Sequence, residues 1–159
     1  MFFVRIDDRY IHGQVGAVWA SHLQIKNILI ANDELVKDSL ACTMQKLSAS
    51  SLKVIIKNVD DASKYLSSLP EHILKKTLLI VNCPLDVLRI INNGFDIKHV
   101  NIGHSKPDKN KKQVVKYLNV GVEDLVAYQE LQKKGVLIEF QLVPNNKPIV
   151  IDYVNLSLD

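Results

Sequence analysis

FFVRIDDRYIHGQV, the stretch from Phe2 to Val15, joins an apolar run to a turn crowded with ionisable side chains. The apolar run predicts a buried strand. His12 follows the polar turn, so it lies between the carboxyl end of a strand and the start of a helix. In open α/β sheets ligands bind at this place, where free backbone N–H groups and the helix dipole favour an anion. The helix is predicted from about Gln14 by apolar residues at helical spacing: Val15, Val18, Trp19 and Leu23.

A neutral imidazole in this position can act as a nucleophile near neutral pH, because the unperturbed pKa of histidine is about 6.5. The anion expected there is a phosphoryl group. Arg9 carries a planar fork suited to phosphate oxygens, and either Asp7 or Asp8 could fix the tautomer of the ring. A histidine after a strand can also be an ordinary turn residue, hydrogen-bonded to a nearby carboxylate. The candidate site is therefore His12 as the catalytic group, with these phosphate-binding or orienting residues: Asp7, Asp8, Arg9, Gly13 and Gln14.

Bulk composition limits the class of protein. The chain has 159 residues, 47% of them hydrophobic and 23% charged, which suits one domain spanning residues 1–159. A net charge of +3 argues against nucleic acid as a partner, since that needs a concentrated basic face. No apolar run approaches the roughly 20 residues of a membrane span, and the first residues do not resemble a signal peptide, so we expect a cytoplasmic protein. Cys42 and Cys83 lie far apart and are expected to be free thiols.

Apolar runs and helix-like segments alternate along the chain. This alternation predicts a three-layer α/β/α fold with a mostly parallel open sheet, which could carry an antiparallel edge strand. A helix is expected from Asp33, as N-cap, with an inward apolar stripe at Leu35, Val36, Leu40, Met44 and Leu47. The other expected helices are 14–22, one from 60 or 61, 84–93 and 122–134. The expected strands are 2–6, 25–31, 53–57, 77–81, 99–102, 114–118 and 136–143.

Parallel strands joined by helices place their carboxyl ends on one edge of the sheet. The polar residues that follow those strands should therefore surround His12. The candidates for the rim of this pocket are Asp33, His104 and Ser105. His104 is interpreted as an exposed loop residue or as a secondary phosphate contact.

RIDDRYIHGQV closely resembles the active-site segment of the IIB subunits in the mannose/sorbose family of the bacterial sugar phosphotransferase system. The resemblance continues through IANDELVKD, VNCPLDVLRIINNG, HVNIG and GVLIEFQLVP. It implies that His12 accepts a phosphoryl group from a histidine of a IIA domain or protein. The group would then pass to a sugar held by the membrane subunits IIC and IID, with which the chain would associate peripherally. The family pattern usually has an aliphatic residue where this chain has Tyr10, and often a second glycine at His104.

No cofactor or metal is required in this interpretation, which makes the chain a protein-histidine phosphotransferase. The sugar is not predicted, because its specificity is expected to reside in the membrane subunits. The sequence also leaves open a homo-oligomer and whether the IIA domain is a separate chain.

Three alternatives stand beside this interpretation. Asp7 and Asp8 also resemble the Mg²⁺ site of aspartyl-phosphate receiver domains, although Asn58 stands where their acceptor aspartate would be. Cys83 follows a strand, and some unrelated IIB domains use a cysteine. Pro84 removes one amide of the required phosphate loop and Leu85 is bulky, so Cys83 is predicted to be structural. The third alternative is a non-catalytic domain that binds a phosphorylated ligand.

Overall fold

The computed structural model describes residues 1–159 apart from the side chain of Gln14. A seven-stranded sheet in the order β3-β2-β4-β1-β5-β8-β9 forms its middle layer. All neighbouring strands are parallel except β9, which is antiparallel to β8 at the edge. The strands are β1 (Phe3–Asp7), β2 (Asn27–Ala31), β3 (Lys53–Lys57), β4 (Thr77–Val81), β5 (His99–His104), β8 (Leu137–Phe140) and β9 (Ile149–Val150).

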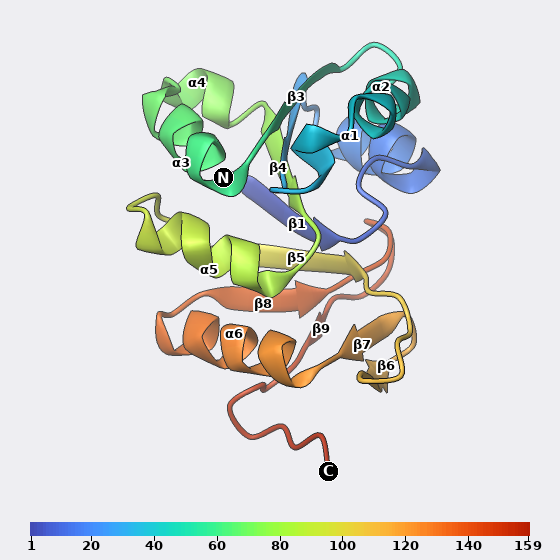
Figure 1. Cartoon of the computed structure of the whole chain (residues 1–159), viewed down its shortest axis with the longest axis vertical. Coiled ribbons are helices and arrows are strands. Elements are labelled where there is room, and N and C mark those ends of the chain that lie inside the picture. The colour runs from blue at the N-terminus through green and yellow to red at the C-terminus, as the bar shows by residue number, and fades with distance from the viewer.

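Helices cover both faces of the sheet, which confirms the predicted three-layer fold (Figure 1). One face carries α3 (Val59–Ser68), α5 (Pro84–Asn92) and α6 (Val122–Lys133), and the short α4 is at Glu71–Leu74. The other face carries a π-helix, η1 (Gln14–Trp19), which continues into α1 (Ala20–His22), together with α2 (Ser39–Ser48). No helix in the described part of the chain has both the length and the apolar character needed to cross a bilayer.

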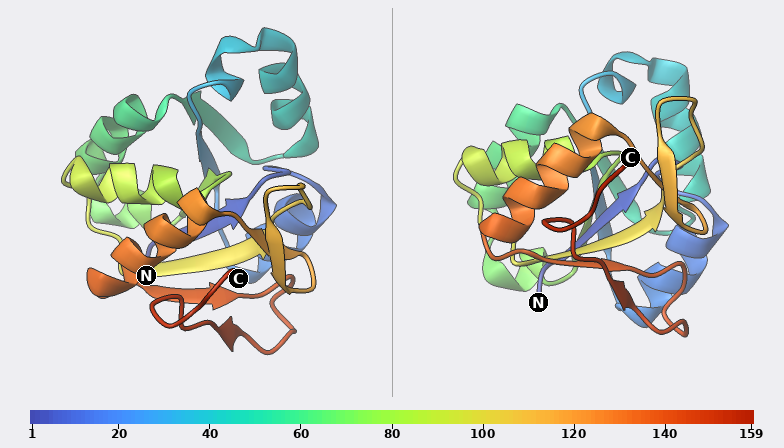
Figure 2. Two further views of the ribbon diagram at one scale, coloured as in Figure 1. Left: turned by 60° about the horizontal axis from the view of Figure 1, so that its bottom comes forward. Right: turned by 90° about the horizontal axis from the view of Figure 1, so that it is seen from below.

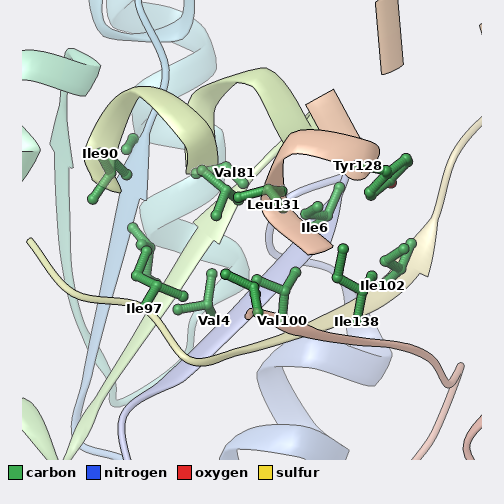
Figure 3. Close-up of a cluster of buried hydrophobic side chains, with 14 of the residues drawn as sticks. Val4, Ile6, Val81, Ile90, Ile97, Val100, Ile102, Tyr128, Leu131 and Ile138 are labelled. Atoms are coloured by element: carbon green, nitrogen blue, oxygen red, sulfur yellow. The ribbon is translucent and has the colours of Figure 1, made fainter. Parts of the chain in front are cut away.

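The strands contribute side chains to two hydrophobic cores, one on each face of the sheet. Along β4, Leu79 and Val81 point into the core beneath α3, α5 and α6, whereas Leu78 and Ile80 point into the core beneath η1. Strands buried on both faces have near-continuous apolar sequences, which is why these runs were recognisable. Figure 3 shows the larger core, where Val4 and Ile6 of β1 meet side chains from β5, α5 and α6.

The predicted stripe on the second helix is wrong in part. Asp38, rather than Asp33, caps α2, and its carboxylate accepts a hydrogen bond from the Ala41 amide. A 3₁₀ turn at Leu35–Lys37 precedes it, so residues after Asp38 do not continue the face of Leu35. Leu40, Met44 and Leu47 are 72%, 56% and 73% exposed.

Two further segments differ from the prediction near the C-terminus. Residues 114–118 were expected as one strand, but they belong to an antiparallel hairpin of β6 (Lys112–Val115) and β7 (Leu118–Val120). Tyr117 turns the chain there with a positive φ of 71°. The last predicted strand ends earlier than expected, and β9 was not predicted. Figure 2 shows the hairpin projecting at the carboxyl end of β5.

Candidate functional site

His12 lies at the carboxyl end of the central strand, as predicted. Asp7 ends β1, and the chain then turns through Tyr10, whose φ is 55°. Ile11 is buried, and its amide donates to Gln45 Oε1 of α2 at 2.7 Å. This anchor brings the His12 ring back over Asp7, where 20% of the side chain remains exposed.

Asp7 accepts the hydrogen bonds that order the site. His12 Nε2 lies 3.1 Å from Asp7 Oδ2. Arg9 reaches the same carboxylate through Nε and Nη2, each at 3.0 Å, and through its backbone N–H at 3.1 Å. A carboxylate facing Nε2 favours the tautomer with the proton on that nitrogen, which leaves the lone pair on Nδ1. Of the two aspartates considered from the sequence, Asp7 is the one that contacts His12.

The Asp7 side chain has no exposed surface. Its burial raises the pKa of the carboxyl group, but hydrogen bonds from His12 and Arg9 and the charge of Arg5 outweigh that effect. The pKa of Asp7 is therefore held well below its usual range. Asp7 is therefore a carboxylate at neutral pH, and it can balance positive charge on the imidazole.

Arg5 is a residue of the candidate site that was not predicted from the sequence. It is fully buried and reaches Asp7 Oδ2 through Nη2 at 3.2 Å. It also bonds the Asn101 side chain and the carbonyls of Gln141 and Leu142. Burial lowers the pKa of Arg5 to about 10, with Asp7 opposing that change, so the guanidinium stays charged at neutral pH. The sequence offered one signal, because Arg5 and Asn101 are polar residues within predicted apolar strands. The structure pairs them in register.

Gly103 leaves the space that the Arg5 side chain fills. A Cβ built on Gly103 would overlap the guanidinium group. On the opposite side, the guanidinium lies 5.0 Å from the centre of the Trp19 ring of η1, a cation–π contact. Trp19 Nε1 donates to the Leu142 carbonyl at 2.9 Å. The buried arginine therefore ties β1, β5, η1 and the segment after β8 together beneath the site.

An anion beside His12 would meet Arg9 and the start of η1. Arg9 is 36% exposed, and among the described contacts its Nη1 has no partner. Gly13 is exposed at the N-terminus of η1, and a Cβ there would meet nothing within 4 Å. The first N–H groups of a helix have no partner within it and attract anions. The side chain of Gln14 lies outside the described part of the chain.

Asp8 holds a second histidine. The His104 ring, at the end of β5, donates from Nδ1 to Asp8 Oδ1 at 2.6 Å, and the Lys106 amide donates to Asp8 Oδ2 at 2.7 Å. Ser105 turns away toward β7, where its hydroxyl donates to the Asn119 carbonyl at 2.6 Å. The structure thus brings His104 beside Asp7 and Asp8 as the partly buried last residue of β5, not as an exposed loop residue, and Ser105 fixes the segment that follows it.

Comparison with known proteins places this chain in a family. Residues 1–156 match the model of the family described as "PTS system sorbose subfamily IIB component". The chain belongs to this family. The IIB chain is 30% identical over 153 residues to the sorbose-specific EIIB component of Klebsiella pneumoniae, covering 95% of this chain and 93% of that protein. It is 29% identical to the fructose-specific EIIB component of Bacillus subtilis, covering 89% and 87%.

Solved structures agree with this assignment. The crystal structure of the IIBSor domain of the Klebsiella pneumoniae sorbose permease has a TM-score of 0.87 at 30% identity, covering 97% of the IIB chain and 95% of that domain. The N-acetylgalactosamine-specific IIB component 1 of Escherichia coli has a TM-score of 0.88 at 25% identity, covering 95% and 99%. The resemblance seen in the sequence is confirmed, and the chain is a sugar phosphotransferase system component.

In this IIB chain, the hydrogen-bond partners of Asp33 are residues other than His12, Asp7 and Arg9. Its carboxylate accepts from the Val59 amide at 3.0 Å and from Arg89 Nη1 at 2.6 Å. These bonds join the end of β2 to α3 and α5, with β4 between β2 and β1 in the sheet. None of the described hydrogen bonds links Asp33 to His12, so its place at the rim of the site stays a prediction.

The residues considered for other chemistries also have structural partners. Cys42 and Cys83 are free thiols, as predicted. Burial and the nearby Asp86 carboxyl group raise the pKa of Cys83 to about 12, so it is a weak nucleophile at neutral pH. Asp7, Asp8 and His104 each offer one possible metal-ligating atom, and these atoms lie within 4.8 Å of one another. Arginine groups already meet both oxygens of Asp7, which makes this trio part of an ion-pair network.

Proposed function

We propose that this IIB chain is a phosphoryl carrier in which His12 Nδ1 is the nucleophile. The observation that carries the proposal is the 3.1 Å contact between His12 Nε2 and the buried Asp7 carboxylate. That contact directs the Nδ1 lone pair away from Asp7. It also balances the positive charge that the ring gains as it forms a bond to phosphorus.

The transfer exchanges one nitrogen–phosphorus bond for another. His12 Nδ1 forms a bond to phosphorus while the bond to the donor histidine breaks, and that histidine keeps the electron pair. The proton on His12 Nε2 stays beside Asp7. Arg9 and the backbone N–H groups around Gly13 and Gln14 stabilise the charge on the phosphoryl oxygens, because positioning and electrostatics dominate phosphoryl transfer.

The proposed donor is a IIA domain or protein, and the proposed acceptor is a sugar held by the membrane subunits IIC and IID. Support for the donor comes from the mannose-specific EIIAB component of Escherichia coli, which is 29% identical over 141 residues. The match covers 87% of this chain and 43% of that protein, whose name, EIIAB, joins an A and a B component. In the second transfer, a sugar hydroxyl oxygen forms a bond to phosphorus and releases its proton to water, while the Nδ1–phosphorus bond breaks and its electron pair returns to Nδ1.

The experiment is phosphorylation by a phosphoenolpyruvate-driven relay mixture, followed by intact mass measurement and mapping of the modified residue. We expect one phosphoryl group on the wild-type chain, stable in base and lost in acid. His12→Ala should remain unlabelled and folded. His72→Ala, which changes an exposed histidine of α4, should label like the wild type. Stoichiometric labelling of His12→Ala, or a phosphate released by hydroxylamine, would contradict the proposal.

A further inference from the structure

A hollow of about 240 Å³ is lined by Arg9, His104, Tyr117 and Leu142. It lies next to the candidate site, because Arg9 also bonds Asp7, the partner of His12. We propose that this hollow is a second phosphate site, in which Arg9 Nη1 and His104 Nε2 hold a phosphate dianion. The proposal rests on the proposed function, since it gives the carrier a place for phosphate next to its nucleophile. His104 stands where the family often has glycine, so the site would belong to this chain in particular.

Arg9 connects the hollow with the nucleophile. Its Nε and Nη2 bind Asp7, whose Oδ2 also meets His12 Nε2. These bonds fix the guanidinium and leave Nη1 without a partner among the described contacts. The same side chain lines the hollow. A planar guanidinium with a free donor suits a phosphate oxygen, and no rotamer has to be ordered when the anion binds.

His104 is oriented from the other side of the hollow. Its Nδ1 is engaged by Asp8 at 2.6 Å, and Asp8 is in turn held by the Lys106 amide at 2.7 Å. Side-chain exposures of 19% for His104 and 16% for Asp8 show that this pair is largely covered by protein. The fixed ring therefore has Nε2 as its remaining polar atom, which accepts a hydrogen bond from a P–O–H group of phosphate when the ring is neutral and donates to a phosphate oxygen when the ring is protonated.

The hairpin formed by β6 and β7 supplies Tyr117 to the wall of the hollow. Tyr117 has a φ of 71°, and such backbone persists only where the surroundings hold it. The Tyr117 carbonyl accepts from the Ser105 amide at 2.9 Å, and its ring centroid lies 6.2 Å from that of His104. Lys116 Nζ lies 5.0 Å from the Tyr117 ring centre. The nearby carboxylates, Asp7 and Asp8, already accept hydrogen bonds, and among the described contacts Arg9 Nη1 is a donor without a partner.

Phosphate in this hollow could have two sources with the same chemistry. One is the phosphoryl group carried by His12, reaching past Arg9. The other is a separate phosphate monoester, such as a phosphorylated sugar product. Titration of the unphosphorylated and the His12-phosphorylated chain separates them.

The test follows histidine ring signals by NMR during titration with inorganic phosphate. We expect a saturable shift of the His104 signal, and His104→Gln should weaken phosphate binding about tenfold, the effect of one lost charge-assisted hydrogen bond. His72→Gln serves as the matched control and should bind phosphate like the wild type. The His104 signal of the wild-type chain gives a result even if the His104→Gln variant does not fold.

The two arms have distinct outcomes. Loss of phosphate binding once His12 is phosphorylated, with a shift of the His104 signal, assigns the hollow to the carried phosphoryl group. Unchanged phosphate binding assigns it to a separate monoester. A His104 signal that responds neither to phosphate nor to phosphorylation, or equal affinity in His104→Gln and wild type, would overturn the second site. Failure of His12 to accept phosphate would instead overturn the proposed function, while the titration of the unphosphorylated chain would still decide the hollow.

Discussion

Asp7 lies at the end of the central strand with no exposed side-chain surface, and it accepts hydrogen bonds from Arg5, Arg9 and His12. A buried carboxylate is costly unless cations and hydrogen-bond donors surround it. Here the compensating groups include His12, the proposed nucleophile. Fold stability and the proposed phosphoryl chemistry therefore depend on one side chain.

Asp7→Asn should lower the free energy of unfolding by about 3–5 kcal/mol at pH 7, because it leaves the buried Arg5 charge without its partner. The pKa of Asp7 is lowered in the folded state, so its contribution is fully present above the unfolded pKa of about 4. It is lost as the pH falls through the folded pKa. Urea unfolding of both proteins at pH 7 and pH 3 should show a smaller difference at pH 3.

The matched control is Asp96→Asn, whose carboxylate is exposed beside Lys98. It should change the free energy of unfolding by no more than about 0.5 kcal/mol. An equal effect of the two substitutions would show that the Asp7 carboxylate does not stabilise the fold by balancing the buried Arg5 charge.

Arg9→Ala should slow phosphorylation of His12 by about 10²–10³-fold, the usual cost of removing one group that stabilises developing charge. His12 should still take up one phosphoryl group at long times, because the nucleophile and Asp7 remain. Rapid-quench measurement of the phosphorylated fraction over time would give both the rate of phosphorylation and the final stoichiometry. A wild-type rate in Arg9→Ala would exclude this role for the guanidinium.

At the scale of elements, α2 supports the site without contributing apolar side chains to the core. Gln45 on its inner side caps the Ile11 amide at 2.7 Å, which fixes the loop before His12. Its outer side carries Leu40, Met44 and Leu47 in contact with solvent. A polar contact anchors the helix to the loop before His12. We therefore expect its exposed apolar side chains to contribute little to the stability of the fold.

Leu47→Ala should therefore change the free energy of unfolding by less than about 0.5 kcal/mol. Leu66→Ala, on α3, removes a side chain that is 1% exposed and should cost about 2–5 kcal/mol. Denaturant titrations of the two variants test this pair. A large loss in Leu47→Ala would mean that α2 packs inward after all.

At the scale of the whole molecule, the C-terminal segment closes the larger core. After β9 the chain returns over α6, where the Tyr153 ring stacks on Tyr128 at a centroid distance of 4.3 Å. Gln132 accepts from the Tyr153 amide at 2.8 Å and donates to the Ile151 carbonyl at 2.8 Å. The segment after β9 thus packs on α6 and extends the larger core.

Tyr153→Ala should lower the free energy of unfolding by about 3–5 kcal/mol, because it leaves a cavity in a fully buried position. Val154→Ala changes the neighbouring side chain, which is 49% exposed, and should have little effect. Thermal and urea unfolding of the two variants would measure the difference. Similar stability of both variants would show that the C-terminal segment does not support the core.

Apolar strand runs and helix-terminating residues made much of the fold predictable. Pro84 opens α5 and the chain leaves that helix at Asn93, as expected. The runs at 53–57 and 77–81 are strands with the predicted bounds. Such signals are local, because backbone geometry limits where Pro and β-branched residues fit. The hairpin turn at Lys116–Tyr117 was missed, since it lacks the glycine or asparagine typical of such turns.

The amino-acid sequence by itself determined the parallel α/β architecture, the family, and the position of His12 at the end of the first strand. These follow from periodicity and from one dense local motif. Only the tertiary structure decided that Asp7 rather than Asp8 contacts His12 and that the buried Arg5 bonds Asp7. It also decided that Asp8 bonds His104. Each of those contacts depends on how the chain turns after β1 or on strands far apart in sequence, and a carboxylate's partner is set by three-dimensional distance rather than by spacing along the chain.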